Sequence, residues 1–192
     1  MAVLPLLTAL LLTQSATDSL PFHRGQWAAQ FAGGLNFASL GFLKFRSTKR
    51  ALMVDIRVDG GHGEDLATDS TGTHFAGVGS HANLDIRFGW RHYHPAGHKV
   101  AAYQSLGLLA GFSHSVAADP VFRSVANGWN AGVFGDIGAS YLLTPRLSVG
   151  ATITGAIRYT DVYEHPDGGG KRRFWELEGS APGLGFVAAL YF

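Results

Sequence analysis

The feature that most constrains this chain is a period-two alternation of apolar and polar residues along most of its length. In Leu52–Val58 the even positions are apolar, and the odd positions include Asp55 and Arg57. Successive side chains of a strand point to opposite faces, so such a segment has one apolar and one polar face. The pattern recurs in Leu84–His92, Trp129–Leu143 and Leu147–Tyr159. The sequence therefore predicts an all-β protein.

Weaker alternation extends the count of predicted strands to eight. The additional strands cover roughly 25–33, 36–45, 100–112 and 174–192. Apart from the first, every second link between strands is long, and the predicted long links are 60–82, 113–128 and 161–173. Short turns alternating with long loops are typical of transmembrane barrels. We therefore predict an eight-stranded antiparallel transmembrane β-barrel, an up-and-down meander over residues 22–192.

Composition bears on which face of the barrel points outward. The polar face is rich in Gly, Ala and Ser, which suits a narrow lumen. Trp and Tyr residues such as Trp27, Trp90 and Tyr159 lie near strand ends, as in the aromatic girdles of membrane barrels. An apolar exterior in lipid explains both observations. The alternative is a soluble lipocalin-like binder, whose apolar face lines an internal ligand site.

Charged residues on the polar face are expected to meet inside the barrel. Buried charges persist when they are paired and hydrogen-bonded, so we interpret them as a structural network that holds the barrel closed. The alternative is a narrow channel with an ion path. The predicted lumen set is Asp55, Arg57, Asp85, Arg87, Arg91, Asp136 and Arg158.

The amino-terminal residues have a different character. An apolar run ends near Thr13 and is too short for a membrane helix, which needs about 20 residues. Small residues follow it, although no Lys or Arg precedes it. We predict a signal peptide over residues 1–16, cleaved between Ser15 and Ser19.

The final segment, Leu184–Phe192, alternates strictly and ends the chain on an aromatic residue. It resembles the carboxy-terminal signature of bacterial outer-membrane β-barrels, and residues 21–192 as a whole resemble the small eight-stranded OmpA/OmpX-like barrel group. The resemblance implies an exported, monomeric, integral outer-membrane protein that contacts outer-membrane lipid and lipopolysaccharide. It also implies that the barrel-assembly machinery reads Phe186, Leu190 and Phe192 as an assembly signal.

Some barrels of this size are enzymes, and one segment has a pattern that could be catalytic. Phe112-Ser-His-Ser-Val-Ala117 invites comparison with the His-x-Ser-Asn pattern of PagL-like lipid A deacylases. Position 116 is Val, however, and Ser113 and Ser115 point away from His114 on a strand. A serine nucleophile needs a histidine within hydrogen-bond reach. We therefore expect a non-enzymatic protein with a structural or surface-interaction role, a lipid A-modifying enzyme being the alternative.

The remaining chemistry is sparse. Two histidine groups, one around His62 and His81 and one around His92 and His94, lack the ordered spacing of a metal motif, so we expect no metal and no cofactor. A formal charge of +1 predicts no nucleic-acid partner. A basic cluster in the last long link is a candidate contact for lipopolysaccharide phosphates, formed by Lys171, Arg172 and Arg173.

Overall fold

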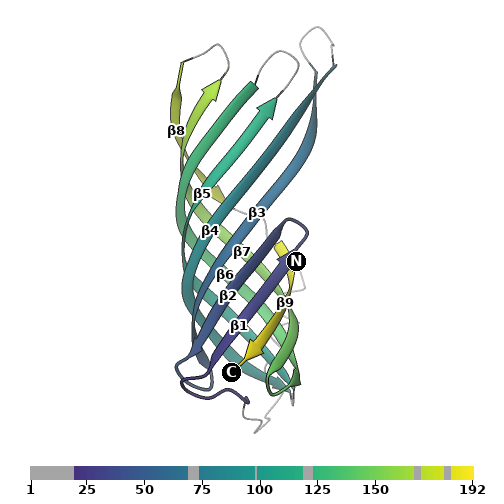
Figure 1. Ribbon diagram of the computed structural model, residues 1–192, viewed down its shortest axis with the longest axis vertical. Helices are drawn as coiled ribbons and strands as arrows, with labels where there is room; N and C mark the ends of the chain where they lie inside the picture. The colour runs from purple at the N-terminus through teal and green to yellow at the C-terminus, as the bar shows by residue number, and fades with distance from the viewer. Residues whose placement is uncertain (1–19, 69–73, 98, 119–122, 167–169, 180–182) are drawn as a thin grey trace, which may run out of the picture.

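A computed structural model of the chain describes residues 20–68, 74–97, 99–118, 123–166, 170–179 and 183–192. The predicted signal peptide, residues 1–16, lies outside these described residues. The described part contains nine antiparallel strands, drawn in Figure 1. They are β1 (Trp27–Gly34), β2 (Phe37–Phe45), β3 (Arg50–Thr68), β4 (His74–Gly97), β5 (Val100–Ala118), β6 (Arg123–Thr144), β7 (Leu147–Pro166), β8 (Arg172–Gly179) and β9 (Gly183–Tyr191).

The strands close into a ring of eight, which confirms the predicted barrel. Each strand from β1 to β7 pairs with the next one, and β9 joins β7 to β1. The predicted strand 174–192 is wrong as a single element, because β8 and β9 divide it. They pair with different halves of β7: β9 with Leu147–Thr154 and β8 with Ile157–Glu164.

The predicted long links are largely strand, which corrects the loop assignment. The β3–β4 ladder continues from Arg50↔His92 to Thr68↔His74, through the Gly-rich segment that was expected to be a loop. The β5–β6 ladder likewise reaches Ala118↔Arg123. Pairing with a neighbouring strand satisfies the backbone even where the apolar alternation has faded. The hairpins therefore extend far beyond the closed ring, as Figure 1 shows.

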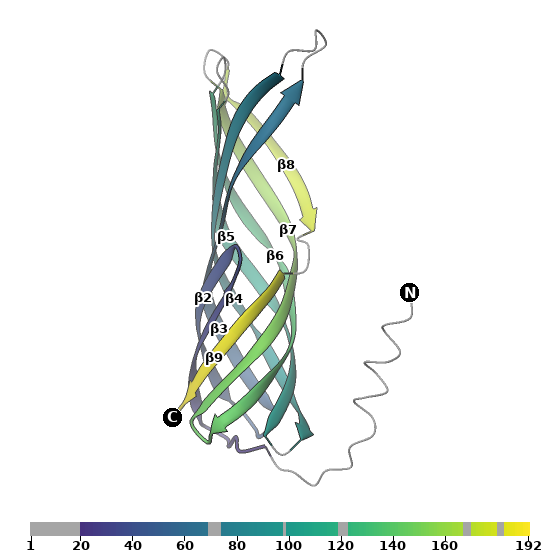
Figure 2. The same ribbon diagram turned by 90° about the vertical axis from the view of Figure 1, so that its right-hand side faces the viewer.

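The two ends of the barrel differ. Both the start of β1 and the end of β9 lie at one end, called here the terminal end, and the long hairpins form the distal end (Figure 2). The β1–β2 hairpin is short and stops about halfway up. Above it, the described strands form a six-stranded sheet from β3 to β8, with no ladder between β8 and β3. Among the described strands, the wall is thus a closed ring only in the terminal half.

The apolar face of the strands points outward. Ile86, Leu106 and Ile137 are 58%, 70% and 66% exposed, whereas Asp55, Asp85 and Asp136 are buried in the lumen. This arrangement excludes the lipocalin-like alternative, which requires the apolar face inside, and it fits lipid as the surrounding medium. The described residues include no helix that is long and apolar enough to cross a bilayer.

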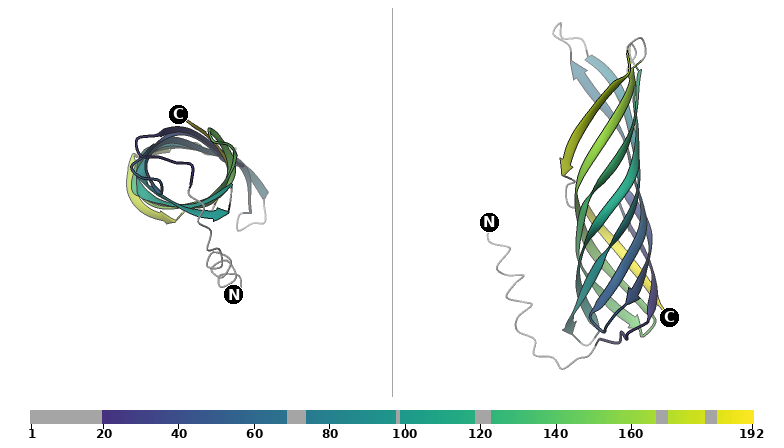
Figure 3. Two further views of the ribbon diagram at one scale, coloured as in Figure 1. Left: turned by 90° about the horizontal axis from the view of Figure 1, so that it is seen from below. Right: turned by 90° about the vertical axis from the view of Figure 1, so that its left-hand side faces the viewer.

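Aromatic side chains fill the lumen at the terminal end. The segment before β1 crosses this end of the barrel, as the view from below in Figure 3 shows. Its Phe22 is 3% exposed, and its ring centroid lies 4.6 Å from that of Phe45, 4.9 Å from Tyr93 and 5.1 Å from Tyr191. Together with Tyr103 these rings form what we call the aromatic floor.

Candidate functional site: an ion-pair belt across the lumen

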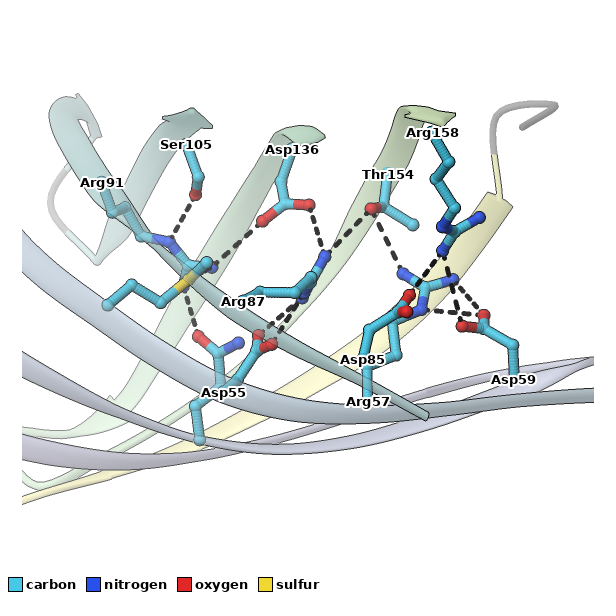
Figure 4. A network of polar contacts seen from close by, with 12 residues as sticks. Asp55, Arg57, Asp59, Asp85, Arg87, Arg91, Ser105, Asp136, Thr154 and Arg158 are labelled. Atoms are coloured by element: carbon cyan, nitrogen blue, oxygen red, sulfur yellow. Dashed lines mark hydrogen bonds and ion pairs between the residues drawn. The ribbon is translucent and has the colours of Figure 1, made fainter. Parts of the chain in front are cut away.

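The structure brings all seven predicted lumen residues together above the aromatic floor (Figure 4). They come from β3, β4, β6 and β7 and project inward. Every second side chain of a strand lies on the same face, and these residues share the lumen face with the buried Gly, Ser and Thr residues. An eighth residue, Asp59, joins them. We call this group the ion-pair belt: Asp55, Arg57, Asp59, Asp85, Arg87, Arg91, Asp136 and Arg158.

Arg87 occupies the centre of the belt. Its Nε donates to Asp55 Oδ1 at 2.7 Å, and its Nη2 donates to Asp55 Oδ2 at 2.6 Å, so the pair is bidentate. Its Nη1 lies 3.3 Å from Asp136 Oδ1. The guanidinium carbon is also 4.6 Å from the centroid of Phe134. Such a planar donor set fixes the orientation of both carboxylates, which a lysine could not do.

Arg91 links the belt to the aromatic floor. Its Nη2 lies 3.7 Å from Asp136 Oδ2, and its Nε donates to Ser105 Oγ at 2.9 Å. Its Nη1 donates to the side-chain oxygen of Gln30. The guanidinium carbon lies 4.1 Å from the ring centroid of Tyr103, which is part of the floor. Floor and belt therefore form one continuous filling of the terminal half.

The distal part of the belt contains two further arginines. Arg158 Nη2 donates to Asp85 Oδ2 at 2.7 Å and lies 3.8 Å from Asp59 Oδ2. Arg57 Nε donates to Asp59 Oδ1 at 2.8 Å, and its guanidinium carbon is 3.9 Å from the centroid of Phe37. This part joins β3, β4 and β7 beside the β1–β2 hairpin, because Asp59 is the register partner of Phe37, the first residue of β2.

The belt is electrically balanced, because four arginines face four aspartates. Burial of an unpaired charge in this position would destabilise the folded state through lost hydration, whereas the fold can accommodate charges that are paired and hydrogen-bonded. The side chains of Arg87, Asp55 and Asp85 are only 6%, 0% and 0% exposed. A barrel of eight strands is just wide enough for its side chains to fill. The arrangement therefore fills the lumen at this height and links strands that face each other across it as well as neighbouring strands.

Sequence reasoning missed several members of this site. Asp59 continues the odd-numbered polar face of Asp55 and Arg57, so the alternation could have identified it. Gln30 and Thr154 could not be identified in this way, because their roles depend on register between strands far apart in sequence. Thr154 Oγ1 accepts from Arg57 at 3.3 Å and from Arg87 at 3.4 Å.

Above the belt, the lumen opens into a vestibule of about 410 Å³. Its lining comes from β4 to β8 and mixes polar residues, such as Asn130 and Thr160, with apolar ones, such as Val162 and Phe174. His114, at its edge, shares a hydrogen bond of 2.8 Å between Nδ1 and Asn127 Oδ1. Asn127 belongs to the adjacent strand β6, a contact that the pattern along one strand could not show.

The predicted basic cluster lies at the distal end. Lys171 and Arg172 are exposed, and Arg173 forms a bidentate pair with Asp161, with contacts of 3.0 and 2.6 Å. The hydrogen bond from Arg173, together with its charge, holds the pKa of Asp161 below its ordinary value. Two of the three cations are therefore open to an external anion, and the third is already paired.

The predicted assembly-signal residues point outward, Phe186 and Leu190 from β9 and Phe192 from the residue that follows it. Phe186, Leu190 and Phe192 are 75%, 51% and 66% exposed. Phe192 also exchanges backbone hydrogen bonds with Trp27, both at 2.9 Å, which fastens the last residue to the first strand. Their role as a signal remains a prediction.

Both histidine groups lie on strands rather than in loops. The rings of His92 and His94 stack with centroids 4.6 Å apart near the terminal end of β4. His62 belongs to the β3–β4 hairpin, opposite Ser80. Within the described residues, no group of three His, Cys, Asp or Glu side chains converges in a way that could hold a metal ion.

A closed antiparallel barrel with an apolar exterior and a filled, charge-balanced interior has the architecture of the membrane β-barrels. No protein-family model matches the chain, and no curated protein matches it. The structure does match those of several solved proteins. A major outer membrane protein from Thermus thermophilus superposes with a TM-score of 0.62 at 14% identity, over 87% of this chain and 98% of that one. The outer membrane protein OprG from Pseudomonas aeruginosa gives 0.55 at 12% identity, over 90% and 99%. The chain therefore has the fold of the small outer-membrane β-barrel proteins.

Proposed function

We propose that this chain is a non-enzymatic, monomeric protein of a bacterial outer membrane that acts through its distal hairpins. The observation that carries the proposal is the ion-pair belt, which closes the axis while the hairpins extend well beyond the closed ring. With a signal peptide removed from residues 1–16, the terminal end faces the periplasm and the hairpins face outward. Binding residues commonly lie on exposed connections above a rigid scaffold.

Trypsin added to intact cells tests both location and orientation. Cleavage is expected in the segment of Lys171 and Arg172, whereas Lys99, in the turn at the terminal end, should be protected until the outer membrane is opened. The folded barrel should also need detergent for extraction and migrate faster on gels when unheated. Protection of Lys171 together with cleavage at Lys99 would contradict the proposed orientation.

We propose lipopolysaccharide phosphates as the anions bound by the exposed cations at the distal end. The support is location and chemistry, because guanidinium donors match phosphate oxygens. A Lys171→Gln, Arg172→Gln variant should bind lipopolysaccharide more weakly than the native chain in a pull-down. Arg173→Gln is the matched control, since its guanidinium is already paired with Asp161. Equal binding by all three proteins would remove this assignment.

A lipid A-modifying enzyme is the alternative within the same compartment. His114 is held by Asn127, and the serines beside it alternate with it along β5. Mass spectrometry of lipid A from cells with and without the protein separates the two functions. An unchanged lipid A spectrum is expected, and loss of an acyl chain would overturn the non-enzymatic proposal.

A second candidate function rests on the incomplete wall. A cavity of about 340 Å³ lies where the wall is interrupted, and its lining includes Leu35, Phe37 and Leu184 together with belt residues. Because the belt fills the axis, this side offers a small apolar molecule a route to the lumen that does not pass through the belt. Bilayer recordings distinguish this candidate from the narrow channel: a side-access site conducts no ions, whereas a channel does.

A further inference from the structure

The terminal end of the barrel has an unbalanced charge. The segments that build it, 20–54, 89–107, 137–152 and 184–192, contain no Asp or Glu. Apart from Arg91, which is committed to the belt, their cations lie in the turns or next to them. These cations form what we call the basic rim: Arg24, Lys44, Arg46, Lys49, Arg50, Lys99 and Arg146. Such a uniform field attracts anions to this end of the molecule.

A long apolar groove of about 1020 Å³ rises from the basic rim along the outer face of the barrel. Most of the outward side chains along it are aliphatic, and lumen-facing residues of the same strands, among them Ser105 and Asp136, also border it. Leu106, Ile137 and Ile153 are 70%, 66% and 52% exposed. The groove is therefore part of the surface that faces lipid, and it is at the upper end of the size range of about 300–1,000 Å³ for ligand sites.

Two glycines create the groove. Gly135 of β6 and Gly155 of β7 are register partners with the same outward facing as the flanking aliphatic residues. A Cβ placed on Gly155 would meet nothing within 4 Å, and one placed on Gly135 would find Ser105 O as its nearest atom, at 3.8 Å. The missing side chains thus leave open space on the outside and are not required by close packing of the wall.

The lower end of the groove is polar and cationic. Arg50, His92 and Gln104 are register neighbours on β3, β4 and β5, and all three line the groove. Directly above them Trp90, 54% exposed, lies at the height where aromatic rings mark a membrane interface. The cation at the interface matches the anionic headgroup of a phospholipid, and the apolar groove directed into the bilayer matches one of its acyl chains.

We propose that this face is a binding site for an anionic phospholipid of the periplasmic leaflet. Its phosphate contacts Arg50 and His92, and one acyl chain lies in the groove over Gly135 and Gly155. The proposal rests on the membrane orientation given above. Charge complementarity selects the occupant, because the rim offers several cations and its segments contain no Asp or Glu side chain to compete with a phosphate.

Native mass spectrometry of the detergent-purified full chain tests this site with phosphatidylglycerol and phosphatidylethanolamine as probes. The native chain should retain phosphatidylglycerol preferentially. Arg50→Gln removes a charge-assisted contact and should lower that retention about tenfold. Gly155→Leu places a side chain in the groove on the outer face of the barrel. It should lower retention of both lipids, because it occupies the space of the acyl chain.

Two matched controls keep the interpretation specific. Lys99→Gln removes a rim cation that does not line the groove, and Val54→Leu enlarges an outward side chain on β3, away from the groove. Both should bind lipid as the native chain does. Equal retention of the two lipids, or retention that is unaffected by Arg50→Gln and Gly155→Leu, would overturn the proposal. If Lys99→Gln weakens binding as much as Arg50→Gln, the rim is a diffuse charged surface without a lipid site, which also overturns it.

Failure of the broader function would look different. A chain that dissolves without detergent, or whose gel migration does not change on heating, is not a membrane barrel at all. A chain that passes both of those checks and still shows no preference for phosphatidylglycerol refutes only the lipid site.

Discussion

The aromatic floor and the ion-pair belt lie one above the other in the same lumen, but different forces hold them. In the floor, ring contacts such as Phe22–Phe45 and Phe45–Tyr93 fill the space through non-directional packing. In the belt, directional ion pairs between specific side chains fill the space, as in the bidentate contact of Asp55 with Arg87. Apolar rings can shift to fill part of the space left by a deleted side chain. A buried ion that loses its partner stays buried and uncompensated, which destabilises the fold. The belt should therefore be the more fragile half of the filling.

The largest effect is expected from breaking the belt at its centre. Asp55→Ala leaves the buried Arg87 guanidinium without its bidentate partner, and the free energy of unfolding should fall by about 3–5 kcal/mol. Urea titration in vesicles, followed by tryptophan fluorescence, measures it. Asp161→Ala, which removes a half-buried carboxylate whose partner Arg173 is exposed, is the control. A loss from Asp55→Ala no greater than that of the control would refute the belt as a structural element.

Deleting a ring from the floor should cost somewhat less. Phe22→Ala removes a ring that is 3% exposed, and a loss of about 3 kcal/mol is expected, the low end for such truncations. Phe22 lies on a segment before the first strand, so the neighbouring rings can close part of the space. The same urea titration gives the value, with exposed Phe31→Ala as control. A loss exceeding that of Asp55→Ala would reverse the proposed ranking.

Removing both partners of the central pair sharpens the comparison further. In Asp55→Leu, Arg87→Met the lumen loses one positive and one negative charge, so the remaining belt stays balanced. Apolar replacement of a buried pair is often neutral, and stability within about 1 kcal/mol of the native chain is expected. The double variant should then be clearly more stable than Asp55→Ala, and the reverse order would show that the charges themselves strengthen the fold.

The smallest effect belongs to the exposed pair at the distal end. Arg173→Ala should let the pKa of Asp161 rise toward its ordinary value of 3.8, which carboxyl NMR titration can follow. Because Arg173 lowers the pKa in the folded state, the pair stabilises the fold above the unfolded-state pKa and loses that contribution as the pH falls through the folded-state pKa. Salt should screen the pair readily. An unchanged Asp161 pKa in Arg173→Ala would remove the pair as the cause.

Alternation was sufficient to predict the ring and the inward facing of Asp55, Arg87 and Asp136. It failed where a strand continues without alternation, as in the Gly-rich stretch of β3 and β4, because partner strands supply hydrogen bonds that leave no pattern in one segment. It also failed at the break between β8 and β9. The outward apolar residues are at odd positions in β8, such as Trp175 and Leu177, and at even positions in β9, such as Phe186, so one continuous strand could not hold them all. The contacts of Gln30 and Thr154 depend on register, which a single strand does not encode.

The position of Phe22 has a consequence for the order of assembly. Its neighbours Phe45 and Tyr191 come from β2, the second strand to be synthesised, and from β9, the last strand of the ring. The floor is therefore complete only when the final strand has met the first, and the amino-terminal segment must already be inside at that moment. Burial of Phe22 therefore indicates that the ring has closed, with the last strand, β9, paired to the first strand, β1.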